Sequence, residues 1–384
     1  MTVTAPSGFV ASGVAAGIRR GRPDLALVRS RPRATGAAMF TANRAAAAPV
    51  KVSREHLEVA EPQAVVVNSG VANAATGARG ELDARATAAE AGRLLGLPAE
   101  EVLVLSTGVI GAPLPLQKVL DGLEQAAASL SAEGGASAAE AILTTDTRTK
   151  QAVAGGRGFA VAGMAKGSGM IHPNLATMLA VVTTDYALEP GEASDFLRPA
   201  VESSFNSISV DGECSTNDTV VLLANGAAGA SRDDDAFAAA LGRVCGELAR
   251  QIVADGEGAT LIAEINVAGA ASEPEARAIA RRIATSPLVK TALFGRDANW
   301  GRVLAAAGSA PFNGGYAQLD AERVTLRFNG APVLVAGAPQ GVEPDLDGAA
   351  CRIELDVGLG DGAASYLTSD LSYDYVRINA DYRT

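Results

Sequence analysis

The amino-acid sequence predicts a fold of the α/β class, in its α+β form, with mixed, largely antiparallel sheets layered with helices. Short apolar runs typical of strands alternate with longer segments whose apolar residues recur at helical spacing. Several later runs are apolar at every second position, so each of these strands has one apolar face. Helices are therefore expected on the outer faces of the sheets. The length of 384 residues favours two or three domains.

The first half of the chain contains two expected strands and two expected helices. The first strand is Ala64–Asn68, which stops at a turn sequence. The second is Val102–Ser106, which is expected to lead into a sharp turn at Thr107-Gly108. An Ala-rich helix is expected over 82–95, ending before a glycine, and another over 116–130, where leucine and valine recur at helical spacing.

The second half begins with an apolar, strand-like run and continues with helices and one-sided strands. The run covers 178–183; the helices are expected over 237–252 and 276–283, and the strands over 261–267, 324–328 and 353–357. Two connections, 131–140 and 332–348, are rich in glycine or proline and are expected to be loops. Neither of them indicates a domain boundary, and no repeat of fixed period is found.

Composition excludes several classes of function. The net charge is −11 and no run rich in Lys and Arg compensates for it, so binding to nucleic acid is disfavoured. Hydrophobic residues make up 48% of the chain, yet no stretch approaches the ~18 unbroken apolar residues of a membrane-spanning helix. The basic residues near the N-terminus follow the apolar part, which is the wrong order for a secretory signal.

Cysteine and histidine are both scarce. The three cysteines, Cys214, Cys245 and Cys351, are far apart and indicate neither a disulfide framework nor a zinc site. A reduced, cytoplasmic location is expected, without a metal. With only His56 and His172 in the chain, an enzyme of this sequence is expected to work without a catalytic histidine. A general-base role for His172 is the less favoured alternative to a loop histidine.

Thr177 stands where a glycine-rich segment meets the apolar run, and this position suits an N-terminal nucleophile. If the bond between Ala176 and Thr177 breaks, Thr177 gains an α-amine with a pKa of about 7.7–8.0. One residue then supplies both the hydroxyl nucleophile and its base. The hydroxyl of Thr177 can itself cleave the bond, by attacking the carbonyl of Ala176. The pattern alone leaves open an ordinary strand that follows a glycine-rich loop.

One segment, KGSGMIHPNLATMLA at 166–180, resembles the signature of the ornithine acetyltransferase family, the self-cleaving glutamate N-acetyltransferases. Motifs along nearly the whole chain also resemble those of this family. Other matching segments, in the same order as in the family, are GFVASGVAAGI (8–18), FTANRAAAAPV (40–50), SREHL (53–57), VNSGVANAATG (67–77), STGVIG (106–111), ILTTDTRTK (142–150), SVDGECSTNDTVVLLANG (209–226), DGEGAT (255–260), SPLVKTALFGRDANWGR (286–302) and SYDYVRINADYRT (372–384).

The resemblance implies a role for each matching position. Thr177 is the nucleophile that accepts the acetyl group, and cleavage falls between Ala176 and Thr177. Thr107 and Gly108 form the oxyanion hole. The substrate contacts it implies are Thr144, Lys166, Thr177, Glu257, Asn379 and Thr384. Thr145 competes with its neighbour Thr144 for that role. Five further motif residues are expected to form structural hydrogen bonds around the site: Asp211, Asn217, Asp218, Asn299 and Trp300.

The resemblance also implies the reaction and the assembly. Thr177 takes acetyl from N-acetylornithine and passes it to glutamate in two steps, and bifunctional members also use acetyl-CoA. No cofactor is expected. Cleavage gives an α fragment, 1–176, and a β fragment, 177–384, and two copies of each are expected to form a heterotetramer in the cytoplasm. Two lobes are expected, with the active site between them.

The chain departs from the family's pattern at four places, which leave alternatives open. They are Val71, the pair Glu213-Cys214, Leu261 and Arg383. Leu261 and Arg383 adjoin implied substrate contacts, so a paralogue acting on a related N-acyl amino acid is one alternative. A second is an amidase or aminopeptidase with the same type of nucleophile, which uses water as acceptor. A third is a scaffold that has lost activity.

Overall fold

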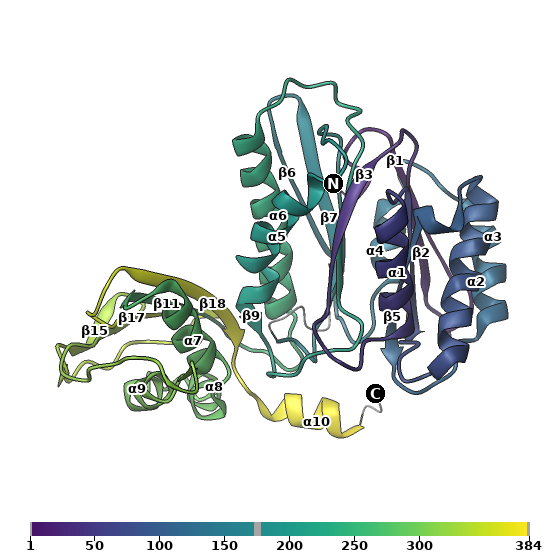
Figure 1. Ribbon diagram of the computed structural model, residues 1–384. Helices are drawn as coiled ribbons and strands as arrows, with labels where there is room; N and C mark the ends of the chain where they lie inside the picture. The colour runs from purple at the N-terminus through teal and green to yellow at the C-terminus, as the bar shows by residue number, and fades with distance from the viewer. Residues whose placement is uncertain (1, 173–177, 382–384) are drawn as a thin grey trace. The chain divides into compact units, whose positions relative to one another are not determined.

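The computed structural model describes residues 2–172 and 178–381, which form two compact units (Figure 1). Unit 1 comprises the described residues up to 206 together with 213–252, and unit 2 comprises 207–212 and 253–381. The chain therefore enters unit 2 briefly before it returns to unit 1. Because the chain passes between the two units more than once, no single linker separates them. The amino-acid composition therefore gave no sign of a domain boundary.

Unit 1 contains two mixed sheets. The first has the order β1-β2-β4-β5, with bounds β1 Phe9–Val14, β2 Leu25–Ser30, β4 Ala64–Val71 and β5 Val102–Val109. The second has the order β3-β10-β8-β7-β6, with bounds β3 Thr35–Phe40, β10 Thr219–Ala224, β8 Leu179–Thr184, β7 Phe159–Lys166 and β6 Lys150–Gly156. Only the pairs β4–β5 and β8–β10 are parallel among these described strands.

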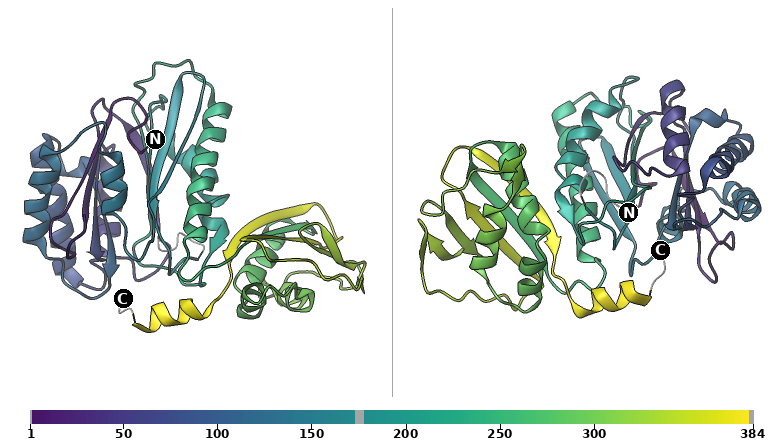
Figure 2. Two further views of the ribbon diagram at one scale, coloured as in Figure 1. Left: turned by 180° about the vertical axis from the view of Figure 1, so that it is seen from behind. Right: turned by 60° about the horizontal axis from the view of Figure 1, so that its bottom comes forward.

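Helices cover the outer faces of both sheets, and the inner faces share one core (Figures 1 and 2). The helices of unit 1 are α1 Ala48–Val59, α2 Gly77–Leu95, α3 Leu116–Ala128, α4 Gly135–Ala141, α5 Ala193–Glu202 and α6 Asp234–Ala254, with short 3-10 turns at Ala99–Glu101 and Phe205–Ser207. α2 and α3 pack on the outer face of the first sheet, whereas α4 contributes alanines to the core between the sheets. All six residues of β8 are buried because this strand is central.

Small aliphatic residues form most of this core, as the scarcity of aromatic residues predicts. Valine, leucine and alanine supply nearly all of the buried positions between the two sheets. A group of aromatic rings in unit 1 is centred on Phe237, on which Tyr186 stacks at 4.6 Å between ring centroids. Phe159 and Phe196 meet Phe237 edge-on. Aromatic pairs of this kind stabilise the fold by more than the burial of their surface alone.

Unit 2 is one seven-stranded mixed sheet with helices packed against one face. The order is β16-β15-β14-β17-β11-β18-β9, with bounds β16 Ala338–Pro339, β15 Ala331–Val335, β14 Thr325–Phe328, β17 Ala350–Asp356, β11 Ile262–Ala270, β18 Gly362–Ser369 and β9 Ile208–Ser209. A hairpin of β12 Pro311–Phe312 and β13 Gly315–Tyr316 lies apart from it. The helices are α7 Glu273–Ala284, α8 Pro287–Phe294, α9 Trp300–Gly308 and α10 Tyr373–Asp381.

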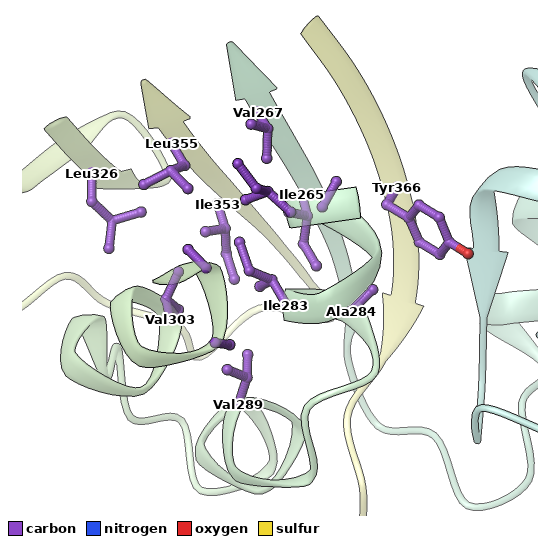
Figure 3. Close-up of a cluster of buried hydrophobic side chains, with 14 of the residues drawn as sticks. Ile265, Val267, Ile283, Ala284, Val289, Val303, Leu326, Ile353, Leu355 and Tyr366 are labelled. Carbon is purple, nitrogen blue, oxygen red and sulfur yellow. The ribbon is translucent and has the colours of Figure 1, made fainter. Parts of the chain in front are cut away.

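Figure 3 shows the core of unit 2, where the apolar faces of the strands meet the helices. Ile265 on β11 and Ile353 on β17 point toward Ile283 on α7. Burial alternates along β11 and β17, so the one-sided strands predicted from the sequence are confirmed. α10 differs from the other helices of this unit, because none of its described side chains is buried.

Most predicted elements are present, and three expectations about connections are wrong. Thr107 and Gly108 lie inside β5, not in a turn, because the parallel pairing with β4 extends to Val109. The expected loop at 131–140 contains the start of α4, whose small residues fit closely between the sheets. The expected loop at 332–348 contains most of β15 and all of β16, which extend the sheet of unit 2 beyond β14 and end it at β16.

Over the described part of the chain, no helix combines the length and the apolar character that crossing a membrane requires.

Replacing Ile353 by alanine tests the core of unit 2. Ile353 is fully buried, and truncating a buried isoleucine costs about 2–5 kcal/mol of unfolding free energy. We expect Ile353→Ala to lower the unfolding temperature measured by circular dichroism. Leu288→Ala is the control, because Leu288 is 61% exposed and its truncation should cost less than about 0.5 kcal/mol. Equal shifts in the two variants would contradict this account of the core.

Candidate active site

Gly108 lies in β5 at a point where the backbone of β4 comes very close. Its φ is +132°, and a Cβ atom built there would stand 2.2 Å from the carbonyl carbon of Gly70. No residue with a side chain fits such an approach. The register of β4 against β5 is irregular at Val71, and Thr107 beside Gly108 is buried. The predicted oxyanion pair therefore lies in a strand of irregular register that is closely packed against its neighbour.

Asn217 ties this strand to the segment that precedes β10. Its Nδ2 donates to the carbonyl of Ser106 at 2.9 Å and to that of Ala72 at 2.6 Å. The next residue, Asp218, accepts from the backbone N–H of Met178 at 3.0 Å through Oδ1. Met178 is the residue that follows Thr177 in the chain. Asn217 and Asp218 thus form the structural hydrogen bonds expected of them, and these connect the strand that carries Thr107 and Gly108 to the start of β8.

Asp218 is a carboxyl group in an unfavourable environment. Burial raises its pKa well above the usual value, and the N–H of Met178 and the charge of Lys166 only partly oppose this effect. Within the described ranges, its second oxygen, Oδ2, has no hydrogen-bond partner. Asp218 is thus less well compensated for burial than a carboxylate that has partners at both oxygens.

Thr144 and Lys166 are brought together by another carboxylate, that of Asp146. Asp146 accepts from the N–H of Thr144 at 2.9 Å and from the N–H of Gly167 at 2.7 Å. Lys166 immediately precedes Gly167 at the end of β7 and is 2% exposed. The rival candidate Thr145 bonds instead to the hydroxyl of Ser168 at 2.7 Å.

Arg19 links the Thr144 segment to the glycine contact. Its guanidinium donates to the carbonyls of Leu143 and of Thr144, the latter at 3.1 Å. Its side chain also packs against Gly70, where a Cβ atom would stand 2.6 Å from Cγ of Arg19. A continuous series of contacts therefore joins four predicted site residues of unit 1, namely Thr107, Gly108, Thr144 and Lys166.

Unit 2 brings together the other two described candidates. Asn379 on α10 donates through Nδ2 to the carboxylate of Glu257 at 2.8 Å. The turn that carries Glu257 is held to the start of α10, since Ser372 donates to the carbonyl of Gly258 at 2.6 Å. A Cβ atom at Gly258 would come within 2.5 Å of the backbone nitrogen of Tyr375. Glycine is thus required at this position.

Some predicted residues lie outside the described ranges. Ala176, Thr177 and Thr384 are among them, as is Arg383. Of the remaining departures, Leu261 is 1% exposed in the core of unit 2, so any influence of its side chain on substrate choice is indirect. Asn299 caps α9 by accepting from the N–H of Arg302 at 3.1 Å, which is the structural role expected of it.

Sequence reasoning missed Asp146, Arg19 and Gly70. Asp146 and Lys150 stand four residues apart inside a motif already singled out, so their pairing could have been suggested. The contact of Arg19 with Thr144 spans 125 residues and gives no local signal. In the described part of the chain, no group of three or more His, Cys, Asp or Glu side chains is placed to bind a metal ion.

Replacing Gly108 by alanine tests the close approach of the two strands. Gly111→Ala is the matched control, because Gly111 also has a positive φ, +81°, but a Cβ atom added there would have nothing within 4 Å. The control should cost about 1 kcal/mol for its backbone conformation. We expect Gly108→Ala to cost about 1–3 kcal/mol more, since the backbone of β4 must move. If denaturant unfolding showed an equal loss of unfolding free energy in the two variants, the close contact between β4 and β5 at Gly108 would be contradicted.

Comparison with known proteins places the chain in a family. Residues 10–384 match the model of the ArgJ family. The chain is 48% identical to the arginine biosynthesis bifunctional protein ArgJ of Symbiobacterium thermophilum, over 100% of this chain and 98% of that protein. It is 46% identical to the protein of the same name from Streptomyces coelicolor, over 100% of both chains.

A solved structure is similar to part of the chain. It is that of ornithine acetyltransferase from Mycobacterium tuberculosis complexed with ornithine, with 43% identity over 45% of this chain and 94% of that chain, at a TM-score of 0.44. The family match and the full-length relatives confirm the family and the class of enzyme that the motifs predict. The chain therefore belongs to the ArgJ family and is an acyltransferase of arginine biosynthesis.

Proposed function

We propose that the enzyme transfers an acetyl group from N-acetylornithine to glutamate through an ester on Thr177. Membership of the ArgJ family supports the reaction. The series of hydrogen bonds and close contacts in unit 1 supports the site, and it is the observation that carries the proposal. It links the strand of Thr107, the connection of Thr144 and the end of β7 at Lys166 to Met178, the residue next to the nucleophile.

The first step in the proposal is self-cleavage. The hydroxyl oxygen of Thr177 attacks the carbonyl carbon of Ala176, the peptide C–N bond breaks, and the nitrogen of Thr177 takes up a proton. Water then hydrolyses the resulting ester and releases the carboxyl end of the α fragment. The α-amine left on Thr177 has a pKa of about 7.7–8.0 in model peptides, so a large fraction is neutral near pH 8 and able to act as a base.

The second step is acetylation. The amine of Thr177 takes the proton from its own hydroxyl as the oxygen attacks the acetyl carbon of N-acetylornithine. Thr107 and Gly108 stabilise the negative charge that develops on the acetyl oxygen; removing one such donor typically costs 10²–10³-fold in rate. The C–N bond to ornithine then breaks, the proton passes to the leaving nitrogen, and acetyl-Thr177 remains.

Glutamate completes the reaction in the third step. Its α-amine attacks the ester carbonyl, the bond to Thr177 breaks, and N-acetylglutamate leaves while the hydroxyl recovers its proton. The relatives are named bifunctional proteins. We propose that the second activity uses acetyl-CoA as the donor for the same acetyl-threonine.

The proposed substrate contacts combine a cation with polar and acidic groups. Lys166 holds the carboxylate of the N-acetylated amino acid, and Glu257 attracts an amine. Thr144, Asn379 and Thr384 complete the set as hydrogen-bonding groups. That the active site lies between the two lobes stays a prediction.

Both proposed fragments contribute strands to the second sheet of unit 1, so they are expected to remain together after cleavage. β3, β6 and β7 belong to residues 1–176, whereas β8 and β10 belong to 177–384. The pairs β7–β8 and β3–β10 are each hydrogen-bonded over six residues. We propose that two α and two β fragments assemble as a heterotetramer in the cytoplasm.

Thr177→Ala tests the nucleophile and the cleavage site together. The wild type is expected to run as two bands on a denaturing gel, of 176 residues and of 208, the latter being the 384 of the chain less the first 176. Thr177→Ala should give one full-length band and no acetyl transfer, whereas Thr177→Ser keeps a hydroxyl and should still be cleaved. A wild type that transfers acetyl groups without being cleaved would overturn the assignment.

The acceptor is tested by measuring ornithine release from N-acetylornithine with and without glutamate. Sustained release should require glutamate, because the acetyl-enzyme otherwise accumulates after one turnover. Initial rates at several glutamate concentrations should give the parallel double-reciprocal lines of a ping-pong mechanism. Steady release that ignores glutamate would instead indicate a hydrolase with water as acceptor.

A further inference from the structure

The carboxylate of Asp146 receives donors from three directions. Oδ1 accepts from Nζ of Lys150 and from the N–H of Gly167, both at 2.7 Å. Oδ2 accepts from the N–H of Thr144 at 2.9 Å and from its hydroxyl at 3.4 Å. The side chains of Asp146 and Lys150 are both fully buried. Together these hydrogen bonds hold the carboxylate in one position.

Two lysines, Lys150 and Lys166, stabilise the negative charge of the buried Asp146. Burial would by itself raise the pKa of this carboxyl, but the charges of Lys166 and Lys150 and the hydrogen bonds from Lys150 and Thr144 together outweigh burial and hold the pKa well below its usual range. Asp146 is therefore ionised at every pH at which an enzyme normally works. Charge-assisted hydrogen bonds of this kind are roughly twice as strong as those between neutral groups.

The donors come from segments that carry two proposed substrate contacts. Thr144 lies in the connection between α4 and β6, and Gly167 follows Lys166, the last residue of β7. Lys150 opens β6, where it pairs with Ala165 of β7. Lys166 in turn pairs with Leu179 at the start of β8. One carboxylate thus sets the position of the Thr144 connection relative to the end of β7.

We propose that Asp146, paired with Lys150, is a positioning residue that fixes Thr144 and Lys166 relative to one another for binding of the N-acetylated amino acid. This inference rests on the proposed function, in which both residues contact substrate. Asp146 itself needs no contact with substrate. A displacement of about 1 Å at such a site can cost 10²-fold in rate, so a residue that positions two substrate contacts affects the enzyme strongly without touching substrate.

The alternative is that Asp146 only stabilises the fold, and Asp185 provides a matched control. Asp185 is also buried, and it accepts from the N–H of Ala160 at 2.7 Å and from that of Ser7 at 2.8 Å. Ala160 lies at the start of β7, the end opposite to Lys166. Asp185→Asn should therefore perturb the same sheet without disturbing the proposed substrate contacts.

The experiment compares Asp146→Asn with Asp185→Asn in the cleaved, purified enzyme. Asparagine has the shape of aspartate but presents an NH₂ group to donors on one side and removes the counter-charge of two lysines. We expect Asp146→Asn to raise KM for N-acetylornithine at least about tenfold, and by more than kcat falls. Asp185→Asn should lower the unfolding temperature while KM stays within about twofold of the wild type.

Similar KM values in the two variants would overturn the inference and leave Asp146 a structural residue. If Asp146→Asn does not fold, Asp146→Glu replaces it, since it keeps the charge but displaces the carboxylate by one methylene. A KM of wild-type size in Asp146→Glu would also contradict the proposal. Mass analysis of the wild type separates the two hypotheses. Absence of acetyl on Thr177 rejects the proposed function, whereas acetylated Thr177 with an unchanged KM in the Asp146 variants rejects this inference alone.

Discussion

The arrangement of the candidate site in unit 1 depends on two carboxyl groups that are buried in the protein. A buried carboxylate is tolerated only when cations and hydrogen-bond donors replace the water it has lost. Asp146 meets this condition through Lys150, Lys166 and two backbone N–H groups. Asp218 meets it only in part, so the pKa values of the two carboxyls shift in opposite directions. The positive charge of Lys166 acts to lower the pKa of both carboxyl groups.

These two carboxyl groups hold different parts of the same site. Asp146 joins the Thr144 connection to the end of β7, and Asp218 holds the start of β8 through Met178. The neighbour of Asp218, Asn217, reaches the strand that carries Thr107 and Gly108. Segments that are far apart in sequence are therefore fixed by polar contacts to backbone atoms. Such contacts hold the backbone itself in place, which suits chemistry that depends on the exact approach of one hydroxyl group.

Local pattern was enough to predict most helices and strands, but not the contacts between distant segments. The alternation of β11 and β17 and the helical spacing of α6 are properties of short windows, and the structure confirms them. The interpretation of Thr107 and Gly108 as a turn was wrong because their conformation is set by Gly70 on the neighbouring strand. Similarly, Arg19 and Thr144 are 125 residues apart in the sequence and come into contact only through the tertiary structure.

The candidate site was predicted from motifs, with one element of physical reasoning behind it. The scarcity of histidine, and the position of Thr177 between a glycine-rich segment and an apolar run, suggested a nucleophile that carries its own base; the motifs then assigned that role to Thr177. Thr107, Gly108, Thr144 and Lys166 are then connected by contacts that no motif could reveal. Asp146 lies in a matching segment but was not identified as a site residue. The role proposed for it depends on its hydrogen-bond partners, and the sequence alone does not show them.

The most direct test of the account is the intact mass of the enzyme after brief mixing with N-acetylornithine, followed by addition of glutamate. The account predicts two chains, of which only the one beginning at Thr177 gains the mass of one acetyl group. It also predicts that peptide mapping finds this group on Thr177 and that glutamate removes it. An active enzyme that consists of a single uncleaved chain, or an acetyl group that glutamate removes from another residue, would contradict it.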